Sequence, residues 1–184
     1  MNLTEAKARE VLLRFYEPDS DLFRLLWLHS SQVAQLAVDI ARRQPQADCE
    51  RVALYALLHD VGIIRCHAPK IYCLGAEPYL RHGIIGESML RNIDPNLESA
   101  ARVCSRHTGA GLTKEEIIAG NLPLPHMDLL PETIEEKIIC YADKFFSKSR
   151  PDHILDLNTI RTDMLRYGEA QLQRFDALHS QFGK

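Results

Sequence analysis

The sequence contains no apolar run near the ~18–20 residues that a membrane-spanning helix needs. Its opening, MNLTEAKARE, is a polar helix start and not a secretory signal. The five cysteines are odd in number and form no CxxC pair, so we expect reduced thiols. Basic residues are not in excess, since the net charge is −3. These features predict a cytoplasmic protein with no membrane partner and no bulk attraction to DNA or RNA.

Helical periodicity is the dominant pattern in the chain. Hydrophobic residues make up 46% of the 184 residues and charged residues 26%, which is typical of a globular domain with a sizeable core. Helices are predicted over residues 4–15, 21–43, 48–60, 79–92, 96–107, a short stretch from 113, 131–148, and from 156 into the 170s. The prediction is an all-α helical bundle in one domain, 1–184, with an irregular connection at 61–78.

Local residue types mark where several of these helices begin. Asn96 is a plausible N-cap, and Pro131 suits a first helical position. Thr113 and Glu116 have the spacing of a capping box.

Polar side chains of metal-ligand type recur on the apolar faces of the predicted helices. They are His29, His59, His82, His107 and Asp143. Asp60 follows His59 at a helix end, where its direction can differ. Any one of these taken alone is most simply a core residue with satisfied hydrogen bonds. Burying several unpaired polar groups is costly, however, and a shared metal ion removes much of that cost. The joint pattern therefore favours a metal site.

The order of these residues resembles the HD-domain superfamily of metal-dependent phosphohydrolases, in its dinuclear form. His59-Asp60 is the HD pair, HGIIG at 82–86 resembles the HxxxG segment of dinuclear members, and HTG at 107–109 resembles their second added histidine. EEKIICYADKFFSKS at 135–149 resembles the helix that carries the closing Asp. The resemblance covers about residues 20–150, which would form a metal-binding core with flanking terminal helices. Among characterised branches, the chain most resembles the YqeK-like enzymes, which hydrolyse diadenosine tetraphosphate.

This resemblance implies two cation positions that share one carboxylate. One cation would be bound by His29, His59, Asp60 and Asp143, and the second by His82 and His107 with Asp60 bridging. Iron or manganese is the expected ion, with magnesium, cobalt, nickel or zinc as alternatives. The implied reaction is in-line attack of a metal-bridged hydroxide on a small phosphorylated substrate, expected to be a nucleotide. His59 and Asp60 would be the catalytic pair.

The chain departs from the family pattern at one position. Many dinuclear members have HDxGK, but the lysine position holds Ile63 in HDVGII. Arg65 is a candidate replacement, although a shift of two residues changes the helix face. Lys144, Lys148 and Arg150 follow the closing Asp and are candidate phosphate contacts, with Lys144 and Lys148 expected on one helix face. A solvated surface explains each of these four residues equally well. The GYP signature of cyclic-di-GMP phosphodiesterases is also absent, which argues against that substrate.

Two other functions remain open at this point. A mixed-valent di-iron oxygenase of the same superfamily uses the same six ligand types. A non-catalytic domain could keep the metal for stability or bind a nucleotide without turnover. The oligomeric state is also open, because the first and last helices are amphipathic and could pair between two chains in a homodimer.

Overall fold

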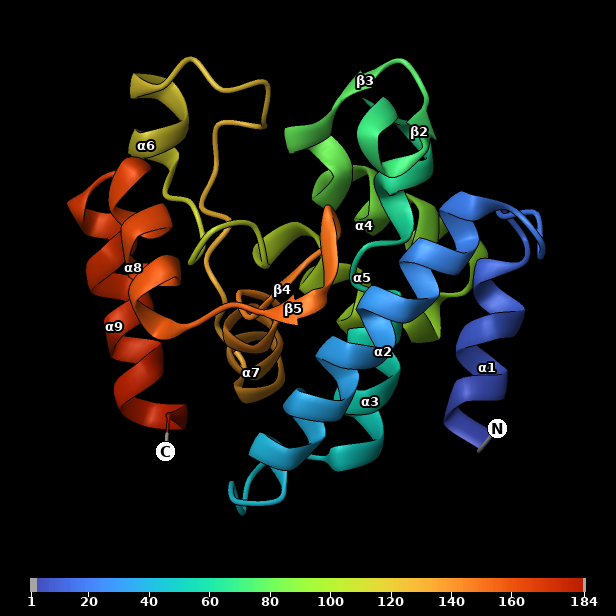
Figure 1. Cartoon of the computed structure of the whole chain (residues 1–184), viewed down its shortest axis with the longest axis horizontal. Helices are drawn as coiled ribbons and strands as arrows, with labels where there is room; N and C mark the ends of the chain where they lie inside the picture. The colour runs from blue at the N-terminus through green and yellow to red at the C-terminus, as the bar shows by residue number, and fades with distance from the viewer. Residues whose placement is uncertain (1–2, 184) are drawn as a thin grey trace.

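The computed structural model describes residues 3–183, and these are mainly helical, which confirms the all-α class (Figure 1). The α-helices in this range are α1 (Leu3–Leu12), α2 (Asp21–Ala41), α3 (Cys49–Leu58), α4 (His82–Ile93), α5 (Glu98–Arg106), α6 (Lys114–Ala119), α7 (Ile134–Asp143), α8 (Leu157–Arg166) and α9 (Glu169–Phe182). None of the described helices is both long and apolar enough to cross a membrane.

Short strands and 3-10 turns fill two of the connections. The first contains η1 (Val61–Arg65), β1 (Cys66–Ala68), η2 (Pro69–Ile71), β2 (Cys73–Leu74), β3 (Glu77–Pro78) and η3 (Tyr79–Arg81). Its strands form a sheet in the order β2-β1-β3, antiparallel between β1 and β2 and parallel between β1 and β3. The second connection is an antiparallel hairpin of β4 (Phe146–Ser147) and β5 (Arg150–Ile154). These strands are too short to show the alternation that identifies a strand in a sequence.

The main core is built around α2, which packs against α3 and α7. Phe23, Leu26, Val33 and Ile40 lie on its buried face at helical spacing. Each large apolar side chain buried in this way contributes about 1.5–3 kcal/mol. Ser20 caps the helix, because its side chain accepts a hydrogen bond from the backbone N–H of Phe23. Buried residues of every other described α-helix except α6 belong to this same core, and Ile117 of α6 packs in a second, smaller cluster with Leu124 and Leu129.

Two predicted helix starts were wrong, and a third was confirmed. Asn96 does not cap α5. The Asp94 carboxylate instead accepts the Asn96 N–H at the start of η4 (Pro95–Leu97), and α5 follows Leu97 without a side-chain cap of its own. The N-cap of α7 is Thr133 rather than a residue beside Pro131, and Thr133 forms a capping box with Glu136. The capping box of Thr113 and Glu116 before α6 is confirmed.

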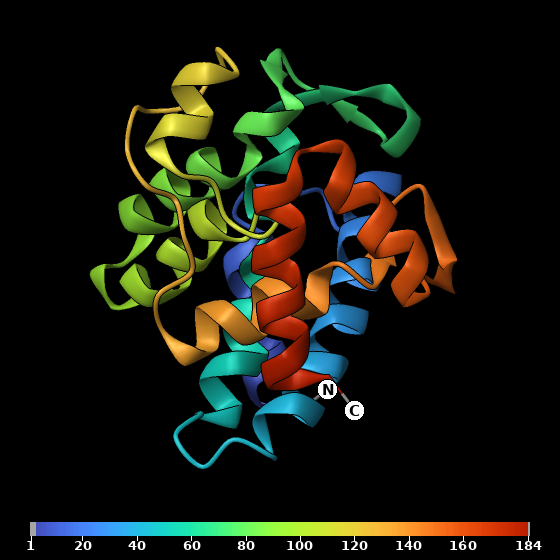
Figure 2. The ribbon, with the colours of Figure 1, turned by 90° about the vertical axis from the view of Figure 1, so that its left-hand side faces the viewer.

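The predicted last helix is two helices, α8 and α9, separated at Gly168. This residue has a φ of 117°, which side-chain-bearing residues rarely adopt. Figure 2 shows α9, in red, crossing in front of α7, and the two helices are in contact. The break at Gly168 therefore lets the chain turn back and cover α7.

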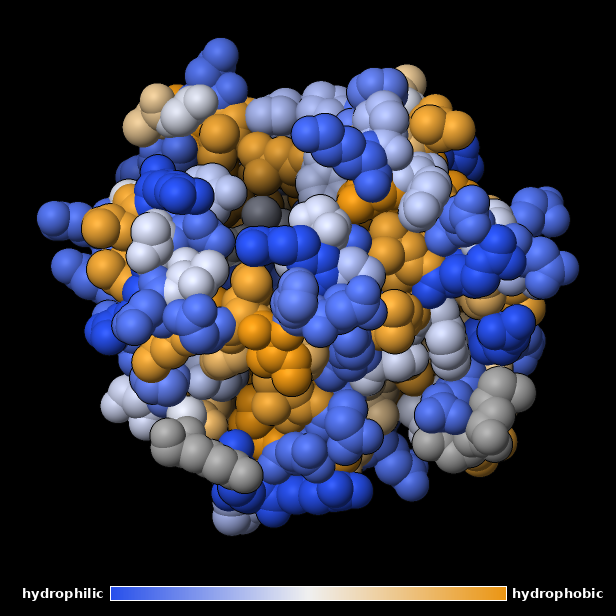
Figure 3. Space-filling model, in the orientation of Figure 1, coloured by the Kyte–Doolittle hydropathy of each residue, from blue (hydrophilic) through white to orange (hydrophobic). Residues whose placement is uncertain are grey.

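An apolar hollow lies on the face between α9 and α2, where Figure 3 shows apolar side chains gathered at the surface. Its volume is about 510 Å³. Its apolar walls are formed by Leu36, Ile40, Tyr141, Phe145, Phe146, Ile154 and Phe182. Segments distant in sequence therefore meet on this face: α2, α9, and α7 with the hairpin that follows it.

Candidate metal centre

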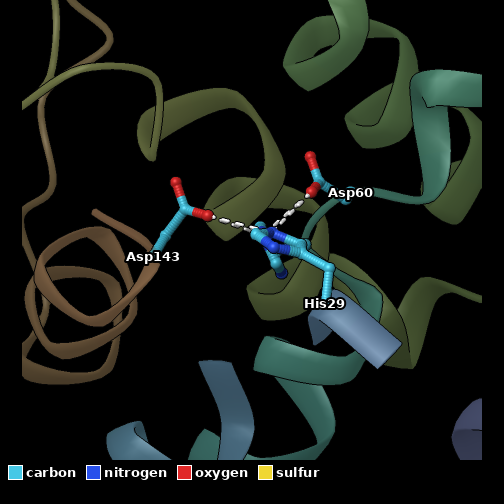
Figure 4. A group of neighbouring side chains, drawn as sticks. His29, Asp60 and Asp143 are labelled. Carbon is cyan, nitrogen blue, oxygen red and sulfur yellow. Dashed lines mark ion pairs between the residues drawn. The ribbon is translucent and has the colours of Figure 1, made fainter. Parts of the chain in front are cut away.

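The first donor cluster lies where α2, α3 and α7 meet. His29 comes from the middle of α2, His59 caps the C-terminus of α3, and Asp143 is the last residue of α7. His29 Nε2 lies 3.2 Å from Asp60 Oδ2 and 3.1 Å from Asp143 Oδ1, as Figure 4 shows. His59 Nε2 lies 3.1 Å and 3.4 Å from the same two oxygens. The structure therefore brings these four predicted residues together.

The second cluster joins the first through Asp60. His82 begins α4, and His107 caps the C-terminus of α5. Their Nε2 atoms lie 3.4 Å and 3.5 Å from Asp60 Oδ1, and 3.0 Å from each other. One carboxylate thus presents Oδ2 to the first cluster and Oδ1 to the second. This is the arrangement needed for a ligand shared between two cations.

The histidine rings are fixed by carbonyl groups three residues earlier in the chain. The Nδ1 atoms of His59, His82 and His107 lie 2.6 Å from Ala56 O, 2.7 Å from Tyr79 O and 2.8 Å from Cys104 O, respectively. A carbonyl can only accept, so each Nδ1 carries the hydrogen in these bonds. The Nε2 atoms then face Asp60, where each can bind a proton or a cation. Such bonds orient metal-ligating histidines in proteins.

The donor set fits divalent cations. His29 Nε2, His59 Nε2 and both oxygens of Asp60 are buried, and they form no regular hydrogen bond beyond the close contacts within the clusters and the ion pair with Lys148. Poorly satisfied polar groups are costly to bury, and a shared cation would reduce that cost. Neutral imidazole and carboxylate are ligands that zinc, iron and manganese accept. Each of the two clusters could therefore hold one cation.

Two lysines reach the carboxylates of these clusters. Lys148 Nζ forms an ion pair with Asp60 Oδ2. Lys144 Nζ lies 2.7 Å from Asp143 Oδ2 and donates to His107 O at 3.0 Å. Burial alone would raise the pKa of Asp60, but the Lys148 ammonium and the His59 imidazole outweigh it and hold that pKa well below its usual range. The site therefore keeps Asp60 ionised.

The expected geometry of the lysines was wrong, although both lie at the site. Since α7 ends at Asp143, Lys144 and Lys148 do not share a helix face. Lys148 instead lies in the turn between β4 and β5, which returns it to Asp60. The structure places Arg65 at the end of η1 and Arg150 at the start of β5, both exposed.

A cavity of about 340 Å³ opens beside the first cluster. Asp143, Lys144, Lys148, Ser147 and Ser149 form its polar wall. Ile71, Tyr79, Phe146 and Leu155 form its apolar wall. The Tyr79 ring also stacks on His82, with ring centroids 4.9 Å apart. Sequence reasoning missed Tyr79, because its role depends on the fold of the 61–81 connection.

Two glycines of the recognised motifs allow the backbone segments that carry Asp60 and His82 to pack closely together. A Cβ at Gly62 would lie 2.1 Å from His82 O and 2.5 Å from Gly86 N. The turn after Asp60 therefore packs backbone to backbone against the start of α4. This contact brings Asp60 and His82 together, so the glycines of HDVG and HGIIG belong to one interface.

Cation binding to the first cluster is expected to strengthen as pH rises. Burial alone would lower the pKa of His59, but Asp60 and Asp143 outweigh it and raise it to about 9. A cation must displace that proton, so its affinity should rise about tenfold per pH unit below this value and level off above it. The second cluster should respond much less, because burial lowers the pKa of His82 to about 3 and that ring is already neutral. Titration with Mn²⁺ between pH 6 and 8 measures both affinities, and a pH-independent first site would contradict the expectation.

Comparison with known proteins gives one family match and relatives of two kinds. The HD domain model matches residues 26–147, a range that contains all six donor residues. An uncharacterized protein of Methanocaldococcus jannaschii is 37% identical over 128 residues, which cover 70% of this chain and 68% of that protein. The tRNA (cytidine(56)-2'-O)-methyltransferases of Picrophilus torridus and Thermoplasma volcanium are 38% and 35% identical over 130 and 121 residues.

The methyltransferase matches are partial. They cover 68% and 65% of this chain but 33% and 31% of the two methyltransferases, so the chain spans about a third of their length. No solved structure matches the chain significantly. The match of the family model over two thirds of the sequence, at the residues that form the two donor clusters, shows that the chain belongs to the HD domain family.

Proposed function

We propose that the protein is a phosphohydrolase that uses divalent cations to cleave a phosphate ester or anhydride of a nucleotide. The observation that supports this most is the sharing of Asp60 by two donor clusters, next to a cavity with two ammonium groups. His29, His59, Asp60 and Asp143 would hold one cation, and Asp60, His82 and His107 the other. Iron or manganese is the proposed ion. Cations there would activate a water molecule and neutralise phosphate charge.

The residues around the cations would position the substrate. Lys144 and Lys148 line the cavity and supply positive charge where a phosphate would enter. Their side chains are only 10% and 13% exposed, so little water screens that charge. Displacement at phosphorus depends mainly on positioning and charge neutralisation, which these groups can supply.

The apolar wall of the cavity supports a nucleotide as the substrate. Tyr79 and Phe146 offer aromatic surface opposite the polar wall, and the cavity volume of about 340 Å³ suits a small molecule. A phosphate at the lysines would leave the base against the aromatic side chains. The names of the two methyltransferases do not support methyl transfer by this chain, because the match covers about a third of each.

A panel of nucleotides and phosphate monoesters tests the proposal directly. Protein purified without chelators and supplied with Mn²⁺ or Fe²⁺ should release phosphate or nucleoside phosphate from at least one nucleotide. The release should stop with EDTA and return with the cation. Failure of the whole panel to exceed the Asp60→Asn variant would reject the function.

Replacing Lys148 by methionine is expected to separate catalysis from cation binding. Removing an ammonium group that contacts the phosphate should lower kcat/KM by about 10²-fold. Cation affinity should hold or improve, because the Lys148 ammonium no longer competes for Asp60. Lys114→Met, at an exposed position on α6, is the matched control and should change neither quantity. A Lys148→Met variant with unchanged kcat/KM would remove this residue from the substrate site.

A further inference from the structure

The loop after His107 is held by a side chain about sixty residues later in the chain. Gln171 of α9 is 1% exposed. Its Oε1 accepts the N–H of Ala110 at 2.8 Å, and its Nε2 donates to Gly111 O at 2.7 Å. The side-chain amide therefore bonds the loop as a neighbouring strand would, with one donor and one acceptor. Both bonds are buried, where their loss would leave the backbone groups of Ala110 and Gly111 unpaired.

The loop has the shape needed to receive this amide. Gly109 and Gly111 have φ values of 59° and 85°, in the region that favours glycine. A Cβ at Gly109 would lie 2.6 Å from Gln171 Oε1. Arg174, one turn further along α9, donates to Gly111 O at 3.1 Å and pairs with Glu116. Thus α9 contacts the loop through two adjacent side chains.

This contact bears on His107, the donor that immediately precedes the loop. The carbonyl of His107 accepts a hydrogen bond from Lys144, and its ring supplies Nε2 to the second cluster. A loop free to move would let the end of α5 and the imidazole move with it. The Gln171 amide lies outside residues 26–147, so the family match does not include it.

We propose that Gln171 is a positioning residue for His107, and that through it α9 sets the affinity of the second cation position. The proposal rests on the cation sites proposed above. Gln171 touches neither cation nor substrate. Outer groups that orient a ligand typically change metal affinity by about 10–100-fold when they are removed. Removing Gln171 should therefore weaken binding of the second cation and leave the affinity for the first unchanged, because His107 is not a donor in the first cluster.

The test compares Gln171→Met with Gln173→Met. The first substitution keeps the side-chain volume and removes both hydrogen bonds, and the second places the same change at an exposed position of α9. Titration with Mn²⁺ should give two equivalents for the wild type and for Gln173→Met. Gln171→Met should keep the first equivalent at unchanged affinity and bind the second about 10–100-fold more weakly. If Gln171→Met bound both equivalents as tightly as the wild type, or lost affinity equally for both, the proposal would be overturned.

A second measurement separates this proposal from the proposed function. The imidazole resonances of His107, followed by NMR without added cation, should shift or broaden in Gln171→Met while those of His29 stay unchanged. Unchanged His107 resonances would overturn the positioning role, whatever the cations do. A wild type that binds no cation would instead reject the proposed function. Should Gln171→Met fail to fold, Gly109→Ala disturbs the same contact from the loop side and should give the same pattern.

Discussion

Replacing Asp60 by alanine is expected to remove both cations and to lower hydrolysis by about 10³-fold or more. Asp60 is fully buried, and its two oxygens face different clusters. Its loss leaves the first cluster with one carboxylate and the second with none. The remaining histidines are neutral ligands, which cannot offset two divalent charges in a buried site. Metal analysis of protein purified without chelators measures the first effect, and the nucleotide assay measures the second.

Three further variants make this result specific to Asp60. His82→Ala removes a donor from the second cluster alone, so it should retain one cation per chain where Asp60→Ala retains none. Asp152→Ala removes an exposed carboxylate from β5 and should behave as the wild type. Asp60→Asn keeps the side-chain volume and shows whether the fold survives the loss of charge. Two cations bound to a folded Asp60→Ala protein would contradict the shared-ligand arrangement.

Replacing Gly62 by alanine is expected to lower the free energy of unfolding by about 3 kcal/mol or more. The added methyl would meet His82 O at 2.1 Å and Gly86 N at 2.5 Å, and both atoms belong to the backbone. Neither can rotate away as a side chain would, so η1 and α4 must separate. Chemical denaturation measures the change in stability, and Mn²⁺ titration shows whether any folded fraction has lost the second site.

Gly120→Ala provides the comparison for this substitution. Gly120 has an ordinary φ of −81°, and an added Cβ would find its nearest neighbours at 3.1 Å. A loss of about 1 kcal/mol or less is expected there, because the Leu122 side chain can adjust and the contact with Glu116 O needs to lengthen by only a few tenths of an ångström. If Gly62→Ala were as stable as Gly120→Ala, the close approach between η1 and α4 would not be required for the fold.

Helical periodicity was enough to predict the donors that lie on helices. His29 falls on the buried stripe of α2 because it shares helical spacing with Leu26 and Val33. Asp143 follows the same rule on α7. The position of Asp60 follows from no period, because it lies between α3 and η1, where a turn sets its direction. Asp60 was predicted from the family resemblance, and in the structure it belongs to both donor clusters.

The position of Lys148 could not be predicted from helix spacing alone. Helix spacing predicted that Lys148 would lie one turn after Lys144, but α7 ends and a hairpin returns Lys148 to Asp60. The pairing of β4 with β5 decides that path, and strands of two and five residues leave little trace in a sequence. Gln171 is harder still to predict, because its partners lie about sixty residues earlier. Its helical spacing with Phe175 and Leu178 predicts that it is buried, unlike Gln173, but does not predict which groups it contacts.

The carbonyl bonds to His59, His82 and His107 have a consequence for how the centre discriminates among ions. Each ring is aimed by the peptide group three residues before it, so its direction is set within one turn of its own segment. Movements of whole helices would then change the distances between these imidazole rings but not the orientation of each ring within its own segment. Preference for a smaller or larger ionic radius would depend on the spacing between helix ends, which the contact between Gly62 and α4 controls.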